Sequence, residues 1–574
     1  MPVSNSDVSR SFNLIADLLE LQDANRFRVR SYRDAARTID SLSTNVRDMV
    51  KAGEDLTALD GIGDDLSAKI EEQVETGSIQ KLEELKQDIP IGLTDLLRIE
   101  GLGPKKVQKL WDSLGITNVE ELEQAARDHR IQEISGFGQK TEQNILDHIE
   151  DAKHEEVRTS LKEAEEVAEP FREYLADHPS VDRVEIAGSY RRRKETVGDL
   201  DFLVISESGD EVSDYFTDYE DVAEVLSHGD TKSSVVLKND MQVDVRIIPE
   251  ESYGAALMYF TGSKEHNVAL RTIAVEDDLK VNEYGVFDED GERIAGETEE
   301  EIYDLFNCEY IRPELRENRG EVQSAQDGEL PELVDTEDIR GDLHSHTTDS
   351  DGSNSIQEMV GAARELGYDY FAVTDHTDYV TVTNGHDTES LRDQLNRVDE
   401  LNKQFDDFTL VKSCEVDITK DGELYLPDEV LIELDMVLVS VHRYFDLDES
   451  EQTDRVISAL ENPLTDVLAH PTARRLPDRD PINLDMDAVM EAALEFDSFL
   501  EINAQPDRLD LTDLHAKMAK DKGLKVTIST DAHVDRNLDY MQYGVYQARR
   551  GWLEPDDILN TRPWSELQDL FGDN

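Results

Sequence analysis

The stretch that decides the fold runs Gly188-Ser189-Tyr190-Arg191-Arg192-Arg193-Lys194-Glu195-Thr196-Val197-Gly198-Asp199-Leu200-Asp201 and continues into the apolar run Phe202-Leu203-Val204-Ile205. Successive side chains of a β-strand alternate between its faces, so Asp199 and Asp201 point to the same side at the start of one strand. Two carboxylates so placed repel each other unless a divalent cation lies between them, and the pair therefore predicts a Mg²⁺ site. The Gly188-Ser189 turn offers N–H groups and a hydroxyl to an anion such as a phosphate.

A third carboxylate follows in Met241-Gln242-Val243-Asp244-Val245-Arg246-Ile247, where the valines and Ile247 are predicted to face a core and Asp244 a cleft. Acidic pairs alone are weak evidence in a chain so rich in Asp and Glu, but the ordered set is specific. It resembles the palm of the nucleotidyltransferase superfamily, and closely that of the family X DNA polymerases. The resemblance implies two ions, Mg²⁺ or Mn²⁺, held by the three carboxylates. It places Gly188, Ser189, Arg192 and Gly198 at the incoming nucleotide, with Arg191 and Arg193 left open as alternatives to Arg192.

The composition is strongly acidic. The 574 residues include 131 Asp or Glu and 58 Lys or Arg, which gives a formal net charge of −73. The length predicts three or four domains. Acidic runs often mean disorder, but apolar periodicity continues through nearly the whole chain, and we therefore interpret the charge as that of a folded protein working in molar salt, where screening shrinks to ~3 Å. This halophile hypothesis predicts that the protein unfolds or loses activity as KCl is lowered.

Cysteine usage and hydropathy indicate the cellular setting. Only Cys308 and Cys414 are present, far apart and in apolar contexts, so we expect neither a disulfide framework nor a zinc knuckle. We find no signal peptide and no apolar run of membrane-spanning length. The sequence therefore predicts a soluble cytoplasmic protein with no membrane partner.

Helical apolar spacing extends from Val8 to about Ile149 and contains three glycine hairpins. Each hairpin has the form Gly-apolar-Gly between a short helix and a longer one. One such turn would be a weak signal, because glycines also end helices. Three at roughly even intervals resemble the helix-hairpin-helix motif, which presents backbone N–H groups to DNA phosphates. The resemblance implies DNA contacts at Gly61, Gly63, Gly101, Gly103, Gly136 and Gly138.

The first block of about 90 residues resembles the small N-terminal domain of DNA polymerase beta. In that domain a lysine forms a Schiff base with the sugar phosphate left after base excision, and Lys69 stands at the matching position. A nucleophilic lysine needs a lowered pKa, whereas the neighbours Asp64, Asp65, Glu71 and Glu72 favour the protonated amine. Lys69 is therefore a candidate catalytic residue, with a phosphate contact or a surface charge as the alternatives.

Downstream of the palm, Tyr259-Phe260-Thr261-Gly262 and Asn267 resemble the nucleotide-selection helix of the same family. The resemblance implies that Tyr259 and Phe260, with Gly262, pack against the sugar, and that Asn267 faces the minor-groove edge of the base. An aromatic pair in a core turn is the simpler alternative. The polymerase resemblance covers most of residues 1–317, and the polar, glycine-containing residues 318–338 are predicted to form a linker.

A second chemistry begins at Asp342-Leu343-His344-Ser345-His346, on a strand that starts a new α/β domain. Histidines and carboxylates then recur at predicted strand ends, which is the pattern of a barrel with its site at one rim. Six of the fourteen histidines take part, while His266 and His386 remain uncertain. Nine mixed ligands are too many for one ion and predict a cluster suited to Mn²⁺, Zn²⁺ or Fe²⁺. They are His344, His346, Asp351, His376, Glu415, His442, His470, Asp531 and His533.

This ordered set matches the ligands of the polymerase and histidinol phosphatase (PHP) domain, which implies a distorted (β/α)₇ barrel with two or three ions. Nothing that the motif requires is missing, so we expect an active phosphoesterase. The resemblance implies a 3′-5′ exonuclease, with abasic-site endonuclease or 3′-phosphatase activity as further reactions.

The sequence thus predicts a multidomain protein with an all-α helix-hairpin-helix region, an α+β palm and thumb, and a C-terminal barrel. Expected boundaries are 1–90 and 91–150 for the helical domains, 151–250 for the palm, 251–317 for the thumb, 318–338 for the linker and 339–574 for the barrel. We expect a monomeric DNA repair polymerase, acting in base excision repair, that fills short gaps in gapped or nicked DNA with deoxynucleoside triphosphates. Two alternatives are a phosphoesterase with an inactive polymerase module, acting on DNA or a small molecule, and a DNA-end scaffold; both are disfavoured by the intact carboxylates.

Overall fold

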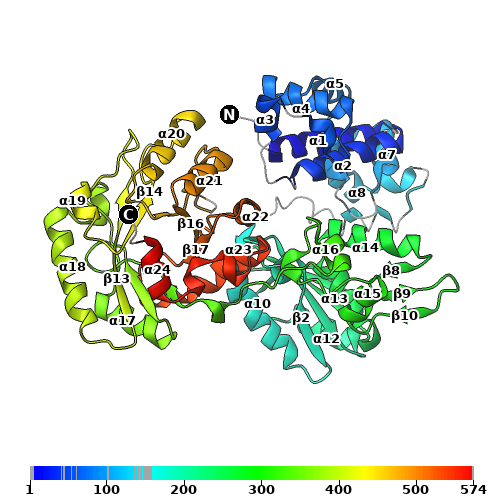
Figure 1. Ribbon diagram of the computed structural model, residues 1–574. Helices are drawn as coiled ribbons and strands as arrows, with labels where there is room; N and C mark the ends of the chain where they lie inside the picture. The colour runs from blue at the N-terminus through cyan, green and yellow to red at the C-terminus, as the bar shows by residue number, and fades with distance from the viewer. Residues whose placement is uncertain are drawn as a thin grey trace. The chain divides into compact units, whose positions relative to one another are not determined.

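The computed structural model describes residues 5–22, 24–40, 42, 46–53, 55–59, 61–97, 99, 102–134, 136–138, 141–142, 145–146, 158–476 and 478–571 (Figure 1). The chain divides into two compact units, one of residues 1–157 with 213–243 and one of residues 158–212 with 244–574. Among the described helices, none is both long and apolar enough to cross a membrane. Cys308 and Cys414 are both buried and free.

Short helices make up the N-terminal part, as the apolar spacing predicts. Phe12 of the first helix and Tyr32 of the second pack edge to face, with ring centroids 5.5 Å apart, and both are almost fully buried. The helices are α1 (Asn5–Leu21), α2 (Arg26–Asp40), α3 (Val46–Ala52), α4 (Asp64–Thr76), α5 (Gln80–Asp88), α6 (Leu93–Leu96), α7 (Pro104–Leu114) and α8 (Val119–Arg127).

The palm begins with β1 (Thr159–Ser160) and α10 (Leu161–Ala176), whose N-terminus is closed by a capping box between Ser160 and Glu163. β2 (Arg183–Ile186) pairs antiparallel with β4 (Asp199–Ile205), and the sheet order places β4 between β2 and β7 (Gln242–Ile248). The single helical turn α11 (Gly188–Arg191) follows β2, and β3 (Thr196–Val197) pairs with β1. Further along the chain, α12 (Gly209–Thr217) precedes the antiparallel pair β5 (Val222–Ser227) and β6 (Lys232–Leu237).

The thumb contains α13 (Tyr253–Thr261), α14 (Lys264–Glu276), a small antiparallel sheet and α15 (Glu299–Leu305). The sheet has the order β10-β9-β8, with β8 (Lys280–Asn282), β9 (Gly285–Phe287) and β10 (Arg293–Ala295).

Residues 318–338, predicted as a linker, contain the helix α16 (Glu321–Asp327). This helix is anchored by a buried carboxylate as well as by Ala325 and Val322, which pack into the thumb core. Glu321 is fully buried, lies 2.7 Å from His266 Nδ1, and accepts backbone hydrogen bonds from Asn318 and Arg319. A hydropathy pattern does not reveal a helix anchored in this way.

The C-terminal part is a nearly closed barrel of seven parallel strands in chain order, which confirms the predicted barrel fold. Beyond the last strand, the N–H of His346 donates to the Ala532 carbonyl at 2.8 Å, so the first and last strand ends meet. The strands are β11 (Gly341–Asp342), β12 (Tyr370–Val373), β13 (Thr409–Asp417), β14 (Met436–Ser440), β15 (Val467–Leu468), β16 (Phe499–Asn503) and β17 (Val526–Ser529).

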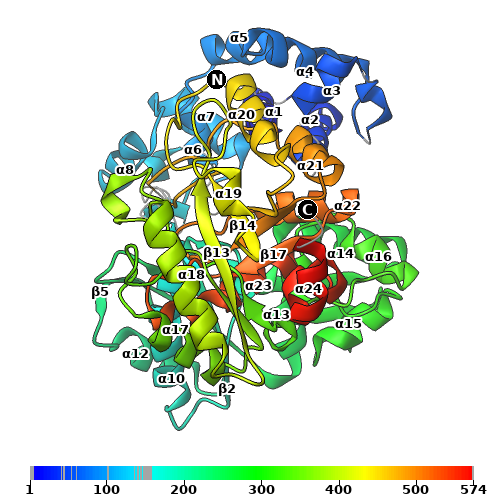
Figure 2. The same ribbon diagram turned by 60° about the vertical axis from the view of Figure 1, so that its left-hand side comes forward.

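Helices cover the outside of these strands. Figure 1 shows α17 (Ile356–Glu365) and α18 (Thr388–Asn402) beside the yellow-green strands, and the turned view of Figure 2 shows α18 along β13. The others are α19 (Asp428–Leu431), α20 (Glu449–Leu460), α21 (Met486–Glu495), α22 (Asp513–Lys522), α23 (Met541–Arg550) and α24 (Trp564–Phe571). Because all seven strands run parallel, their carboxyl ends meet at one rim, and side chains that follow the strands converge there.

Candidate metal centre and nucleotide site

Glu415, on β13, lies at the middle of the rim of the barrel and is almost fully buried. Its Oε1 lies 3.2 Å from His442 Nε2 and 3.0 Å from His470 Nε2. Its Oε2 lies 2.8 Å from His376 Nδ1 and 3.6 Å from His346 Nε2, yet no described donor is aligned to hydrogen-bond to it. A buried carboxylate oxygen that faces imidazoles without an aligned donor is the environment expected of a metal ligand.

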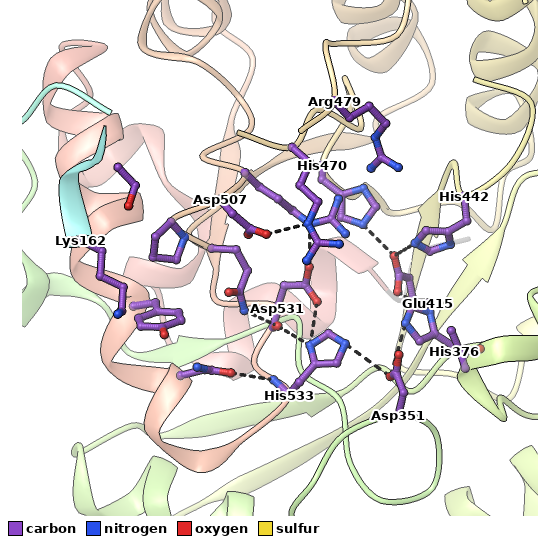
Figure 3. A pocket seen from close by; sticks show the side chains of 18 of the residues that line it. Lys162, Asp351, His376, Glu415, His442, His470, Arg479, Asp507, Asp531 and His533 are labelled. Carbon is purple, nitrogen blue, oxygen red and sulfur yellow. Dashed lines mark hydrogen bonds and ion pairs between the residues drawn. The ribbon is translucent and has the colours of Figure 1, made fainter. Parts of the chain in front are cut away.

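A second carboxylate, Asp531, follows β17. Its Oδ1 lies 3.1 Å from His346 Nε2 and 3.6 Å from His344 Nε2. Asp351 stands in the loop after β11, with its Oδ1 3.4 Å from His533 Nε2 and 3.6 Å from His376 Nε2. Figure 3 shows these carboxylates and the labelled histidines pointing into one pocket, with Asp351 between His533 and His376.

All nine predicted ligands meet at this rim. Four groups of three or four ligand atoms, each within 4.8 Å of one another, contain every one of them. The groups are His346 with Asp351, His376 and His533; His344 with Glu415 and His470; His344 with His346 and Asp531; and His376 with Glu415 and His442. Because the groups share members such as Glu415, the donor set would hold a cluster of ions rather than separate single ions.

Two carboxylates orient these ligands and were not assigned a role from the sequence. Glu501, on β16, lies 2.7 Å from His344 Nδ1 through its Oε1, and its Oε2 accepts from the His470 N–H at 2.8 Å. Asp417 lies 3.0 Å from His442 Nδ1. A ligating histidine commonly donates its second ring N–H to such a carboxylate, which fixes the tautomer and raises the basicity of the ligand nitrogen.

The electrostatics of the rim follow from burial and from the mixture of charges. Burial, with His533 and His376 nearby, lowers the pKa of His346 to about 4, which keeps its imidazole neutral, as ligation requires. Burial also opposes a charge on His442, but Glu415 and Asp417 outweigh it and raise the pKa of His442 to about 10. A proton on His442 must therefore leave when a cation takes its place beside these carboxylates.

The two histidines left uncertain by the sequence lie outside the nine-ligand set. His266 is buried between Glu321 and the Tyr303 hydroxyl, which lie 2.7 and 2.9 Å from its two ring nitrogens. Both nitrogens are therefore used in hydrogen bonds within the fold. His386 lies within 4.8 Å of Asp349 and Asp375, but Arg397, Gln394 and neighbouring hydroxyls already donate to these two carboxylates.

Cationic side chains line the mouth of the pocket. Arg475, Arg479 and Arg508 come from the barrel, and Lys162 comes from α10 of the palm. Arg508 Nε lies 3.4 Å from Asp531 Oδ2, whereas its buried Nη1 has no hydrogen-bond partner among the described residues. Figure 3 shows Arg479 and Lys162 at the edge of the pocket, apart from Glu415. In a chain of net charge −73, four cations around a carboxylate-rich centre favour an anionic substrate.

In the palm, Asp199 and Asp201 stand at the start of β4, and Asp244 lies on β7, the next strand in the sheet order. Gly188 has a left-handed backbone (φ +61°), and a Cβ there would lie 2.6 Å from Asp201 Oδ2. Glycine is therefore required where the turn passes under this carboxylate. In the described part of the chain, the groups of three or more ligand atoms within 4.8 Å all lie in the barrel, and the palm carboxylates are not among them.

The three consecutive arginines have different surroundings. Arg191 makes a bidentate pair with Glu299, at 2.9 and 2.7 Å, and the Arg193 guanidinium lies 4.6 Å from the centre of the Tyr546 ring. Arg192 instead contacts the Thr261 carbonyl and donates to Glu317 at 3.0 Å, next to Gly262. Arg191 also reaches the proposed nucleotide-selection segment, since it donates to the Thr261 hydroxyl at 2.8 Å, but its guanidinium is held in the pair with Glu299. Arg192 lies next to Gly262 in the same segment.

Those residues lie at the end of α13. The rings of Tyr259 and Phe260 pack edge to face, with centroids 5.2 Å apart, and Arg246 stacks on Phe260 at 4.4 Å. Asn267 is buried, and its Nδ2 donates one hydrogen bond to the Tyr259 carbonyl at 2.7 Å. A side-chain amide carries a second N–H, which is the group that a minor-groove acceptor needs. Gly198 lies next to Asp199, between β3 and β4.

Two of the predicted hairpin glycines begin helices, as the hairpin motif requires. Gly63 and Gly103 are the N-cap residues of α4 and α7, and Gly61 and Gly136 have left-handed backbones (φ +74° and +96°). Gly138 is described in the third hairpin, whereas Gly101 lies outside the described residues. Lys69 Nζ pairs with Asp65 Oδ1 at 2.6 Å, which is one of the acidic neighbours named from the sequence.

Family comparisons match successive parts of the chain. A "Helix-hairpin-helix domain" matches residues 3–79, and a "SAM-like Helix-hairpin-helix tandem" matches residues 93–151. "DNA polymerase beta palm" matches residues 158–267, "DNA polymerase beta thumb" matches residues 256–317, and "PHP domain" matches residues 342–478.

Curated relatives match either the whole chain or one part of it. The "DNA polymerase/3'-5' exonuclease PolX" of Bacillus subtilis is 37% identical over 571 residues, covering 99% of both chains. The DNA polymerase lambda of Rattus norvegicus is 21% identical over 54% of this chain and 56% of its own length. A protein of Thermoanaerobacter sp. named "Probable phosphatase" is 27% identical over 38% of this chain and 89% of its own length. Together with the palm and barrel geometry, the full-length match shows that the chain belongs to the family X DNA polymerases that carry a C-terminal PHP domain.

Proposed function

We propose that this protein is a DNA repair polymerase that fills short gaps with deoxynucleoside triphosphates and removes nucleotides 3′ to 5′ through its barrel. The observation that carries the proposal is the full-length match to a relative named for both activities, in a chain that retains the palm carboxylates and all nine barrel ligands. A phosphoesterase with an inactive polymerase module, acting on DNA or a small molecule, is not favoured, since it would need the barrel ligands but not the palm carboxylates. We further propose that the protein acts as a monomer in the cytoplasm on gapped or nicked DNA.

In the palm, we assign Asp199, Asp201 and Asp244 to hold two Mg²⁺ or Mn²⁺ ions, which activate the attacking 3′-hydroxyl and hold the triphosphate. Gly188 and Ser189 would bind phosphate oxygens, with Gly198 in the same loop region. Arg192 would donate to the terminal phosphates, since Arg191 and Arg193 are engaged with Glu299 and Tyr546. Tyr259, Phe260 and Gly262 would contact the sugar, and the second N–H of Asn267 would contact the base.

In the barrel, we assign the nine ligands to two or three ions of Mn²⁺, Zn²⁺ or Fe²⁺, which supply Lewis-acid chemistry for phosphodiester hydrolysis. Glu501 and Asp417 hold the imidazoles of His344 and His442 in the ligating tautomer. Arg475, Arg479 and Arg508 would bind phosphate oxygens next to the scissile bond, because a guanidinium matches their geometry and these three lie at the mouth of the pocket.

In the N-terminal region, Gly61, Gly63, Gly101, Gly103, Gly136 and Gly138 would bind the DNA backbone. Lys69 would contact a phosphate rather than form a Schiff base, since Asp65 pairs with its amine.

An end-labelled, one-nucleotide-gapped DNA tests both activities in a single gel. The protein is incubated with Mn²⁺ in molar KCl, with and without deoxynucleoside triphosphates. We expect extension when nucleotides are present and shortening when they are absent. Shortening without extension would refute the polymerase assignment. Extension without shortening would refute the exonuclease assignment.

Two variants separate the two sites. Asp199→Ala is expected to abolish extension while shortening continues, and His344→Ala is expected to do the reverse. A single substitution that abolished both activities in a folded protein would contradict the assignment of independent chemical centres. The same DNA with an abasic site, or with a 3′-phosphate, measures the further reactions of the barrel.

A further inference from the structure

The loop after the nucleotide-binding turn is held by side chains of the barrel. Glu195 in this loop receives a bidentate pair from Arg474, at 3.2 and 2.7 Å, and lies 3.4 Å from the amide of Gln547. Arg193 stacks on Tyr546 of α23. Arg474 is 5% exposed, whereas Glu195 is only partly buried. Residues 192–195 follow the turn α11 and lead into β3, which precedes the first palm carboxylate, Asp199. Barrel side chains therefore hold the segment between the two parts of the proposed nucleotide site.

Arg550, the last residue of α23, makes the most central of these contacts and is 2% exposed. Its Nη1 donates to the Arg192 carbonyl at 2.7 Å and to Glu317 Oε1 at 3.1 Å. Its Nη2 donates to Asp513 Oδ2 at 2.7 Å. One guanidinium thus joins the backbone of Arg192, the end of the thumb and the start of α22.

Glu317 is shared between two arginines. The same Oε1 accepts from Arg192 Nε at 3.0 Å and from Arg550 at 3.1 Å. Burial alone would favour the protonated acid, but Arg550, Arg192 and Lys194 outweigh it and lower the pKa of Glu317 to about 2. Without Arg550, movement of Arg192 away from Glu317 would leave a largely buried carboxylate without an arginine partner. With Arg550 present, Glu317 keeps one arginine partner when Arg192 moves away.

From this geometry we propose that Arg550 of the barrel is a positioning residue for nucleotidyl transfer. It fixes the backbone of Arg192 and keeps Glu317 neutralised, so that the Arg192 guanidinium is free to leave Glu317 for the triphosphate of an incoming nucleotide. The barrel is on this account a structural part of the polymerase site. The inference rests on the proposed role of Arg192 as a triphosphate ligand.

The test measures the apparent Kd for a deoxynucleoside triphosphate and the maximal rate in single-turnover extension of gapped DNA by the full-length protein. Arg550→Ala is expected to raise the apparent Kd about tenfold or more, because small misplacements of a binding group are costly. The maximal rate should change much less, since the interaction already exists in the ground state. Exonuclease rates on the same DNA should stay near the wild-type value, which reports an intact barrel.

The adjacent residue provides a matched control. Arg549 is also at the end of α23 and is nearly as buried, but its contacts are Glu314 at 2.8 Å and the Val334 carbonyl at 2.9 Å. Arg549→Ala removes an equal charge from the same helix without touching residues 192–195, so its apparent Kd should match the wild type. Equal values for Arg550→Ala and Arg549→Ala would overturn the inference.

Two further variants keep the outcomes distinct. Arg192→Ala must raise the apparent Kd; an unchanged value would overturn the proposed role of Arg192 itself. A raised value in Arg192→Ala with an unchanged value in Arg550→Ala would overturn only the inference.

If Arg550→Ala does not fold, Arg550→Lys takes its place, because a single ammonium cannot reach both the Arg192 carbonyl and Asp513. An intermediate apparent Kd is then expected, and a wild-type value would contradict the proposal.

Discussion

Replacing Glu501 by Gln removes a negative charge that lies behind the ligands rather than among them. Glu501 is fully buried; its Oε1 lies 2.7 Å from His344 Nδ1, and its Oε2 accepts from the His470 N–H at 2.8 Å and from Asn503 Nδ2 at 3.2 Å. The amide introduced by Glu501→Gln would present its N–H hydrogens to one of two groups that are themselves donors. We therefore expect the His344 imidazole to lose the carboxylate that fixes its orientation, and its ligand nitrogen to become less basic.

The size of the effect follows from these contacts. A hydrogen bond to a charged group contributes about 1.5–3 kcal/mol, which corresponds to roughly a ten- to hundredfold loss of metal affinity at about 1.4 kcal/mol per factor of ten. Outer-shell substitutions around metals have effects of the same order. Because Glu501 lies on β16 of the barrel and the palm carboxylates lie on β4 and β7 of another sheet, gap filling should continue at the wild-type rate.

Calorimetric titration of metal-free protein with Mn²⁺ measures the affinity, and the exonuclease assay measures its consequence. Asp466→Asn is the matched control: it also removes a buried barrel carboxylate, but Asp466 receives the Val437 N–H at 2.6 Å just before β15, at the strand end away from the ligands. We expect weaker Mn²⁺ binding in Glu501→Gln alone. Wild-type affinity in that variant, or an equal loss in the control, would refute the assignment of Glu501 as an orienting residue.

Three further outcomes are expected. Burial raises the pKa of Asp466 to about 7, above its value in the unfolded chain, so the stability that depends on its proton is present below pH ~4 and lost as the pH rises through 7. The free energy of unfolding of Asp466→Asn, relative to wild type, should therefore increase by about 3 kcal/mol between pH 5 and pH 8. A difference between the two proteins that is equal at both pH values would contradict this. Lowering KCl from molar concentration should unfold the protein or abolish gap filling, because 131 acidic side chains lose their screening, and full activity in dilute buffer would remove the halophile hypothesis. Borohydride trapping on DNA with a 5′-deoxyribose phosphate should give no adduct through Lys69, whose amine pairs with Asp65, and an adduct lost in Lys69→Ala would reverse that assignment.

Much of the barrel site could be predicted because each ligand belongs to a short pattern that can be recognised locally. His470 and His442 closely follow apolar strands, and parallel strands bring their carboxyl ends together. Glu501 had no such signal, since one carboxylate among many gains its role only from a contact with a histidine 157 positions away. The arginines at residues 191–193 were equivalent in sequence for the same reason. Their partners Glu299, Glu317 and Tyr546 are distant along the chain, and only the fold distinguishes them.

The large negative net charge of the chain also limits how this protein can bind DNA. Neutralising phosphates with cations releases counterions, and this driving force weakens steeply as salt rises. If the halophile hypothesis holds, the screening length is ~3 Å, and neither the net charge of −73 nor a distant lysine would act on the DNA beyond direct contact. Under that condition, affinity would come from groups that touch phosphate oxygens, such as the backbone N–H groups proposed to bind DNA at the start of α4 and α7, and from cations placed at the sites themselves. Arg508 at the barrel rim and Arg192 in the palm are the cations proposed for this role, and in this structure each pairs with a carboxylate, Asp531 and Glu317 respectively. On this argument an acidic exterior and an anionic substrate are compatible, provided that recognition is confined to contacts made inside the two sites and at the hairpins.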